Sequence, residues 1–169
     1  VSMVPVVELR GGVPFGVRFF TDGILIVGYC DVKTDAGGKN PAKEAGLVPG
    51  DCILETNGTP VESAGELASR IEACGGTPLR LTLRHEGEKK EVTLTPAKCA
   101  EDGRHRTGLL VRDSGAGIGT VTYYDPETRT FGALGHGITD GDTAALMPFG
   151  SGAILASTVK AVKKGLKGE

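Results

Sequence analysis

The chain has 169 residues, 39% hydrophobic and 24% charged, a composition typical of globular domains that bury a core without metal or disulfide staples. The net charge of −2 excludes the positive field that draws proteins to nucleic acid or to anionic membrane surfaces. No run of 18 apolar residues occurs, so we expect any membrane anchor or export signal to lie outside these residues.

Glycine is unusually frequent in the sequence, with 27 of 169 residues. Glycine adopts the positive φ angles of tight turns, so this abundance predicts many short strands joined by such turns. Residues 15–20 and 24–29 are rich in strand-forming side chains, and Thr21-Asp22-Gly23 between them predicts a hairpin-type turn. A polar, glycine-rich loop is expected over residues 31–40.

A short helix is expected next, at residues 40–46. Asn40 can cap it, Pro41 suits the first helical position and Gly46 suits its end. The following elements are a tight turn at residues 48–51, a strand at 52–56 and a turn at Asn57-Gly58.

A longer helix is predicted at residues 64–74, with Ser63 as its N-cap and Glu66 completing a capping box. Glu66 and Arg70 are spaced to pair across one turn. Leu67, Ile71 and Cys74 fall on one face. Two alternating strands follow, at residues 79–84 and 91–95, joined through Glu86-Gly87.

The remaining sequence lacks helical periodicity up to residue 156. A charged linker is expected at residues 97–106, then a strand at 108–112, a glycine-rich turn at 114–119, a strand at 120–124 and a turn at 125–128; for 157–164 the pattern does not choose between strand and helix. Phosphate loops open a helix, whereas Gly115, Gly117 and Gly119 precede a strand, so nucleotide binding is not expected.

The four cysteines, Cys30, Cys52, Cys74 and Cys99, are scattered without a Cys-x-x-Cys pair. Zinc sites need closely spaced ligands, so we expect no metal site, and nothing in the sequence indicates a cofactor. Cys52 and Cys74 lie in apolar stretches, which favours buried thiols over disulfides.

Three short motifs occur in the order that PDZ domains use: Ala45-Gly46-Leu47, Pro49-Gly50-Asp51 and Asn57-Gly58. With the order of helices and strands, they make the first half of the chain resemble the PDZ family in its bacterial-protease arrangement. The resemblance implies that a partner peptide adds as a strand beside residues 16–20, opposite the longer helix. The residues expected to contact it are Val13, Pro14, Phe15, Gly16, Val17, Phe19, Leu67 and Ile71.

Two points about this groove follow from the residues themselves. Leu67 and Ile71 suit a core position beneath the groove as well as a place in its wall. Ala64 and Gly65 at the start of the helix provide no histidine to hold a serine or threonine hydroxyl. We therefore expect a preference for apolar peptides.

His136 is the main candidate for chemistry in the second half. Gly135 and Gly137 flank it, which leaves the imidazole open and suits a general base for a serine nucleophile. A histidine in a surface turn is the alternative explanation of the same pattern.

Residues 112–140, which include Gly132-Ala133-Leu134-Gly135-His136, resemble the peptidase domain of the stage IV sporulation protein B family. These are PDZ-containing serine peptidases of endospore-forming bacteria, and the resemblance implies that His136 is the catalytic general base. The family takes its serine from a Gly-x-Ser-Gly-Ser-Pro-type segment that is not found here. Ser114 and Ser151 lack the flanking pattern of a nucleophile, so we expect this stretch to bind peptide without hydrolysing it.

The sequence thus predicts a mostly β chain with two short helices: a PDZ domain followed by an incomplete chymotrypsin-like β-barrel peptidase domain. The expected division is a lead-in at residues 1–12, the PDZ domain at 13–96, a linker at 97–106 and the start of the peptidase domain at 107–169. The alternatives are a non-catalytic PDZ scaffolding module with a structural His136, and an ordinary PDZ housekeeping protease, which the Gly135-His136 block fits poorly.

The resemblance also implies a cellular role. The parent protein would be secreted or membrane-tethered, would act between the two membranes of the developing spore, and would cleave a regulator so that an intramembrane protease processes a sporulation factor. Its expected partners are C-terminal or extended peptide segments of a substrate or regulator, and not nucleic acid. Exposed β edges would also allow a homodimer.

Overall fold

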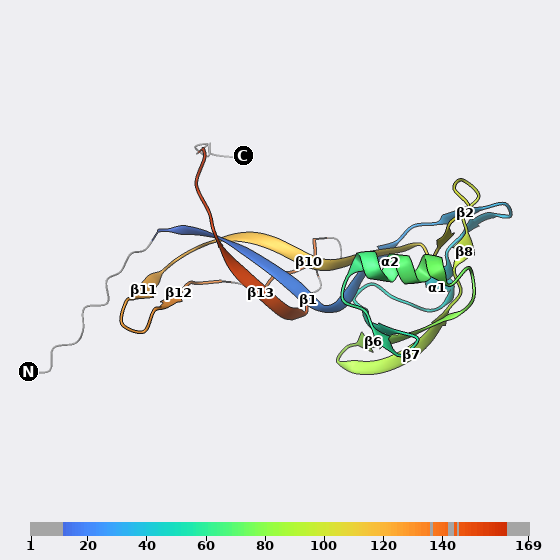
Figure 1. Cartoon of the computed structure of the whole chain (residues 1–169), viewed down its shortest axis with the longest axis horizontal. Coiled ribbons are helices and arrows are strands. Elements are labelled where there is room, and N and C mark those ends of the chain that lie inside the picture. The colour runs from blue at the N-terminus through green and yellow to red at the C-terminus, as the bar shows by residue number, and fades with distance from the viewer. Residues whose placement is uncertain (1–11, 136, 142–143, 145, 162–169) are drawn as a thin grey trace, which may run out of the picture. The chain divides into compact units, whose positions relative to one another are not determined.

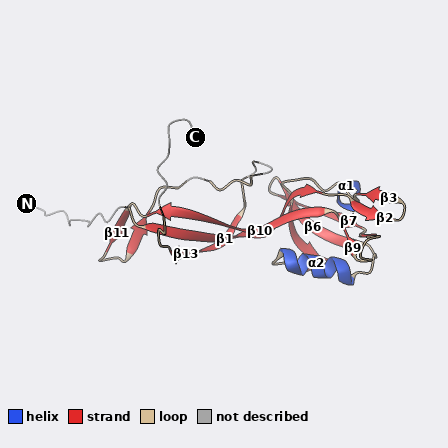
Figure 2. Cartoon of the chain, turned by 90° about the horizontal axis from the view of Figure 1, so that it is seen from above, coloured by secondary structure: helices blue, strands red, loops and turns tan. Residues whose placement is uncertain are grey.

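The computed structural model describes residues 12–135, 137–141, 144 and 146–161. These residues form a mostly β protein with two helices, α1 (Pro41–Glu44) and α2 (Ala64–Ala73), which confirms the predicted fold class (Figures 1 and 2). The strands are β1 (Pro14–Tyr29), β2 (Val32–Thr34), β3 (Gly37–Lys39), β4 (Cys52–Thr56), β5 (Thr59–Pro60), β6 (Leu79–His85), β7 (Glu88–Leu94), β8 (Ala97–Lys98), β9 (His105–Arg106), β10 (Leu109–Thr120), β11 (Tyr123–Asp125), β12 (Thr130–Gly132) and β13 (Phe149–Ala156).

The main sheet has the strand order β10-β1-β4-β6-β7, with β13 pairing β1 and β5 pairing β4. Three hairpins, β2-β3, β8-β9 and β11-β12, stand apart from it. In the part of the chain that the structure describes, none of these sheets closes into a barrel, as expected for an incomplete barrel domain. No helix among the described residues is long and apolar enough to cross a membrane.

The chain forms two compact units. Of the described residues, 20–115, 137–141, 144 and 146–151 make the central unit, and 12–19, 116–135 and 152–161 make the terminal unit. These boundaries differ from the expected division at residues 96 and 107, because each unit combines segments that are distant in the sequence. The segment 97–106, expected as a linker, contains the hairpin β8-β9 and buries Ala97 and Cys99 against Val32.

The central unit is built around alternating strands. Leu79, Leu81 and Leu83 of β6 are buried, and the residues between them face outward, as the period of two requires. The antiparallel ladders β4-β6 and β6-β7 fix the register, with Ile53 opposite Leu83 and Leu79 opposite Leu94. One apolar core results, formed by Ile24, Ile26, Ala42, Leu47, Ile53, Val61, Leu67, Ile71, Leu79, Leu81, Leu83 and Leu94.

The turns predicted at Asn57-Gly58 and Glu86-Gly87 and the cap predicted at Asn40 are confirmed in this unit. Asn57-Gly58 has φ angles of 51° and 78° and Glu86-Gly87 has 48° and 90°, the consecutive positive values of type I′ hairpin turns. Asn40 caps α1 through a bond from the Lys43 N–H, with Pro41 in the first turn.

Two turns predicted from glycine are wrong. β1 runs without interruption through Thr21-Asp22-Gly23, because Gly23 brings the backbone close to β4: a Cβ there would lie 2.8 Å from the Ile53 oxygen. β10 likewise runs through the expected turn at residues 114–119, and a Cβ on Gly119 would lie 2.4 Å from the Phe15 ring. Both glycines permit close approach within a strand.

The terminal unit buries little of its apolar surface. Among its described residues, the buried apolar side chains are Phe15 and Phe19, and Phe15 meets Phe131 edge-on with ring centroids 6.0 Å apart. Ile118 is 86% exposed and Leu134 is 91% exposed. The turn at residues 125–128 forms as predicted, whereas β13 was not predicted, and residues 157–161 carry neither helix nor strand.

Candidate functional site

Helix α2 begins at a well-formed cap. The Ser63 hydroxyl accepts a bond from the Glu66 N–H at 3.1 Å, and the Glu66 carboxylate accepts one from the Glu62 N–H at 2.9 Å. The Glu62 N–H, followed by Arg70, lowers the pKa of Glu66 below its usual value. The predicted cap is therefore present, although the reciprocal bond comes from Glu62 rather than Ser63. The helix buries Leu67 and Ile71.

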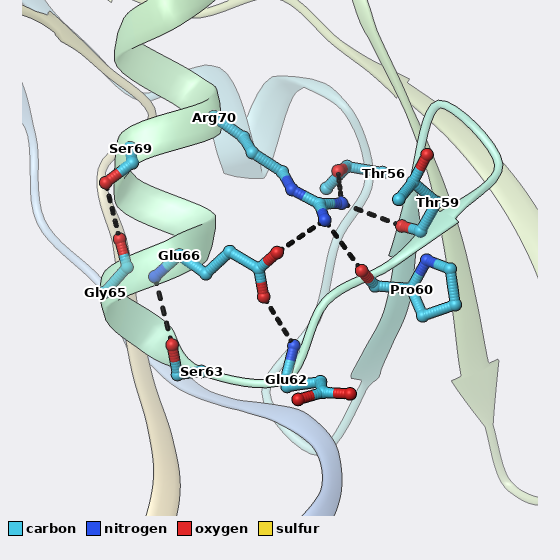
Figure 3. A network of polar contacts seen from close by, with 9 residues as sticks. All are labelled: Thr56, Thr59, Pro60, Glu62, Ser63, Gly65, Glu66, Ser69 and Arg70. Carbon is cyan, nitrogen blue, oxygen red and sulfur yellow. Dashed lines mark hydrogen bonds and ion pairs between the residues drawn. The ribbon is translucent and has the colours of Figure 1, made fainter.

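Arg70 fixes the other side of the helix to β4 and β5 (Figure 3). Its guanidinium donates to the Thr56 hydroxyl at 2.7 Å and to the carbonyls of Thr59 and Pro60 at 2.8 Å each, and it pairs with Glu66 at 2.5 Å. A planar group with several donors suits such a junction. These bonds thus hold α2 in place on the side that faces β4 and β5.

The segment that leads into β10 has a left-handed backbone conformation at Gly108. Its φ is +75°, and a Cβ there would lie 2.3 Å from the Cys30 oxygen, so only glycine fits. The Cys30 N–H donates to the Gly108 oxygen at 2.8 Å, and the Ala42 N–H donates to the Thr107 oxygen at 3.0 Å. Within the described residues, no hydrogen bond uses the Gly108 N–H, which leaves it available to an acceptor.

A cavity of about 390 Å³ lies between α2 and the start of β10. Its apolar wall includes Leu67 and Ile71 from the helix and Leu109 and Val111 from the strand. The full lining is Cys30, Asp31, Val32, Lys33, Ala64, Leu67, Ala68, Ile71, Glu72, Cys99, Glu101, Arg104, His105, Arg106, Thr107, Gly108, Leu109 and Val111. All of these residues belong to the central unit. We call this cavity the α2–β10 groove.

Ion pairs surround the polar end of the groove. Arg104 pairs with Glu72 of the helix at 2.5 Å, and Lys33 pairs with Glu101 at 2.8 Å. The Arg106 guanidinium, followed by the Arg104 N–H, lowers the pKa of Asp102 to about 2. These pairs are exposed and contribute little stability.

The structure brings together only part of the predicted peptide site. Leu67 and Ile71 line the groove and also belong to the buried apolar core, so their position fits both explanations given for them. The strand facing them is β10, whereas the sequence placed residues 16–20 there. The other six residues, Val13, Pro14, Phe15, Gly16, Val17 and Phe19, belong to the terminal unit, where Phe15 packs on Gly119 and Phe131.

The β10 residues that line the groove were not predicted as site residues, because they were expected to belong to the second domain. The two stretches are alike in sequence: Gly108 precedes apolar side chains at Leu109 and Val111, as Gly16 precedes Val17 and Phe19. The signal was present at both places. The stretch that faces α2 can be identified only from the sheet, in which β10 pairs beside β1.

The predicted catalytic residue, His136, lies outside the described residues. Asp140, four residues later, is buried and pairs with the Arg112 Nε at 3.0 Å. Of the two serines considered as nucleophiles, Ser114 donates to Asp113 at 3.0 Å within β10, and Ser151 is exposed on β13.

A buried polar cluster at Asp51 was also missed. Asp51 is fully buried, lies 2.6 Å from His85 Nδ1 and 3.1 Å from Lys90 Nζ, and accepts a bond from the Val48 N–H at 3.1 Å. The cluster ties the turn at residues 48–51 to the hairpin β6-β7. The lining of the groove does not include it, so its role is structural. Within the described residues, no group of three His, Cys, Asp or Glu side chains could hold a metal ion.

An edge strand and a helix that flank an apolar groove define the class of peptide-binding domain to which PDZ domains belong, and residues 38–85 match the PDZ domain family model. Residues 103–169 match the family model of the SpoIVB peptidase S55. The C-terminal part of the chain is therefore similar to the SpoIVB peptidase family, in agreement with the resemblance found at residues 112–140. The two matched regions are thus similar to a PDZ domain and to a peptidase family.

Curated relatives of two catalytic types are similar to the chain. The zinc metalloprotease RasP of Geobacillus kaustophilus is 30% identical over 121 residues, which cover 69% of the chain and 26% of RasP. The putative serine protease HhoB of Synechocystis is 31% identical over 102 residues, covering 60% of the chain and 23% of HhoB. The chain thus spans about a quarter of the length of these relatives. The crystal structure of the PDZ domain of an SdrC-like protein from Listeria monocytogenes is 22% identical, covers 53% of this chain and 87% of that one, and has a TM-score of 0.43.

Proposed function

We propose that the chain is the PDZ region and the first part of the peptidase region of a signalling serine endopeptidase of sporulation. In this proposal the parent protein cleaves a regulatory protein and thereby triggers intramembrane proteolysis of a sporulation factor. The match of residues 103–169 to the SpoIVB peptidase supports this role over that of a general protease. The parent would be secreted or membrane-tethered between the membranes of the developing spore.

The PDZ part binds a C-terminal or extended peptide in the α2–β10 groove. The observation that carries this function is that β10, whose first residues line the groove, is an edge strand of the sheet. An edge strand offers unpaired backbone groups, so a peptide can add as the next strand and place alternate side chains against Leu67, Ile71, Leu109 and Val111. The Gly108 N–H provides a donor for a terminal carboxylate at the start of the strand.

The peptidase part contributes His136 as general base, and the nucleophilic serine comes from sequence outside the chain. Ser114 is engaged with Asp113, which supports the view that it is not that nucleophile. The chain alone therefore binds peptide but does not hydrolyse it. In the alternative, a non-catalytic PDZ scaffolding module, His136 is structural; the fact that the groove lies entirely within the central unit is compatible with this.

Two measurements test the proposal. Fluorophosphonate labelling of the chain should give no signal, whereas the full-length parent should be labelled, and a His136→Ala variant of the parent should not. Labelling of the chain itself would show that a serine within it is activated. Labelling of the parent that persists in His136→Ala would contradict the role of His136 as general base, and a parent that is not labelled would support the scaffolding alternative.

Peptide binding is measured separately by NMR on the chain. Peptides selected from a C-terminal library should shift the amide signals of Leu109 and Val111. An Ile71→Asp variant places a charge in the apolar wall and should abolish the shifts, while Glu55→Gln, on β4 outside the groove, should leave them unchanged. Shifts confined to the terminal unit would contradict the assignment of the groove.

A further inference from the structure

One contact joins the two walls of the α2–β10 groove. The N–H of Ala64, the first residue of α2, donates to the Asp113 carboxylate at 2.8 Å. The other oxygen of this carboxylate accepts the Ser114 hydroxyl at 3.0 Å, which holds the side chain in one orientation. A carboxylate at a helix N-terminus is also favoured by the helix dipole.

The position of Asp113 on β10 places this contact at the far end of the groove. Side chains two residues apart lie on the same face of a strand, so Leu109, Val111 and Asp113 all face α2. Leu109 and Val111 line the cavity, whereas Asp113 does not, because its side chain reaches the helix. The groove is therefore open beside Gly108–Val111 and bridged at Asp113.

The length of the open part follows from strand geometry. An added antiparallel strand pairs residue by residue with β10, and Gly108 to Val111 spans about 10 Å at about 3.4 Å per residue. A peptide whose carboxylate lies at the Gly108 N–H thus has room for about three residues before it meets the bridge. Its fourth or fifth residue would have to pass between Ala64 and Asp113.

We infer that Asp113 limits the ligand of the groove to the last three or so residues of a free C-terminus, and that a longer segment is bound only when the contact with Ala64 is broken. This inference rests on the proposed peptide-binding function. Asp113 is a specificity-determining residue in this scheme: it excludes internal or extended segments and selects chain ends.

The test uses the 169-residue chain, a library of displayed heptapeptides with free C-termini, and three proteins: wild type, Asp113→Ala and the control Ser114→Ala. Ser114→Ala removes the neighbouring hydroxyl but keeps the contact with Ala64. Wild type and the control should select residues at the last three positions only. Asp113→Ala should also select at the fourth to sixth positions, and it should bind its selected heptapeptides on the order of tenfold more tightly than wild type does, a change typical of losing one cap-like contact.

The state of the contact is read independently by NMR. The Ala64 amide signal should move, and its hydrogen exchange should quicken, in Asp113→Ala but not in Ser114→Ala. Wild-type selection that already extends to the fifth or sixth position, or an Asp113→Ala profile identical to wild type, would overturn the inference and leave the proposed function intact. Failure of all three proteins to select any peptide would instead overturn the proposed function and the inference together.

Discussion

The central unit and the terminal unit differ in how much of their apolar surface they bury. The central unit packs both helices and its strand ladders around one continuous apolar core. The terminal unit contains parts of the long strands β1, β10 and β13 and a hairpin, yet its described part buries Phe15 and Phe19 while leaving Ile118 and Leu134 almost fully exposed.

This difference in apolar burial indicates which part of the chain is sufficient to fold. Burial of apolar surface is the main driving force for folding, and a sheet with one bare apolar face gains little from it. The central unit satisfies this requirement with its own residues. The apolar side chains that the terminal unit exposes are those expected of a domain whose other half comes from elsewhere, in agreement with the incomplete peptidase region.

The largest expected effect compares matched truncations in the two units. Leu81→Ala should lower the free energy of unfolding by about 2–5 kcal/mol, because Leu81 is fully buried and its loss leaves a cavity. Ile118→Ala should change it by less than about 0.5 kcal/mol, since Ile118 is exposed. Urea denaturation followed by circular dichroism measures both. Comparable losses in the two variants would mean that the terminal unit has a core of its own.

Asp51→Asn should be the next most damaging change. It removes the charge that faces His85 and Lys90 in a fully buried position, so we expect a loss of about 2–4 kcal/mol. Asp22→Asn is the control, because Asp22 pairs with Arg84 at an exposed site and should cost less than about 1 kcal/mol. Equal effects would contradict the structural importance of the buried cluster.

Cys52 provides a probe of how well the central unit excludes water. Burial raises the pKa of its thiol from 9.0 to about 11. Because the folded pKa is the higher one, the thiol favours folding below pH 9, and this contribution is lost as the pH rises from 9 to 11. The stability of wild type relative to Cys52→Ala should therefore fall by roughly 1–2 kcal/mol over this interval, as measured by urea denaturation at each pH. A difference independent of pH would show that the thiol is hydrated.

The smallest expected effect concerns association of two chains through the exposed surface of the terminal unit. We expect a weak homodimer through its β edges and apolar side chains, visible by sedimentation at high concentration. Leu134→Lys should weaken this association about tenfold, which corresponds to about 1.4 kcal/mol. Glu88→Lys, on β7 of the central unit, serves as the control. A chain that stays monomeric at every concentration would contradict the proposed pairing.

Local signals predicted much of the central unit, because its helices and turns are defined by neighbouring residues. Ser63 with Glu66 and the pair Asn57-Gly58 are examples. Turns were predicted wrongly at Gly23 and Gly119. A glycine that permits close approach of two strands has the same sequence signature as one that permits a turn. The distinction depends on a partner strand far away in the chain.

Only the helix residues of the candidate site were predicted from the sequence, for the same reason. Leu67 and Ile71 were found from helical periodicity, which is a local property. Their partner strand was placed at residues 16–20 instead of Leu109–Val111, since both segments have a glycine followed by alternating apolar residues. Which of the two faces α2 is decided by the order of strands in the sheet, and no neighbouring residue encodes that order.

The alternation of β10 has a thermodynamic consequence. Leu109, Val111 and Asp113 face the groove, whereas Arg112 between them holds the buried Asp140, four residues beyond His136. A ligand that shifts this strand therefore acts on the backbone that carries Arg112. By linkage, whatever factor a ligand applies to the Arg112–Asp140 contact, that contact applies equally to the affinity for the ligand. Occupancy of the groove and the Arg112–Asp140 contact are therefore expected to influence each other through β10.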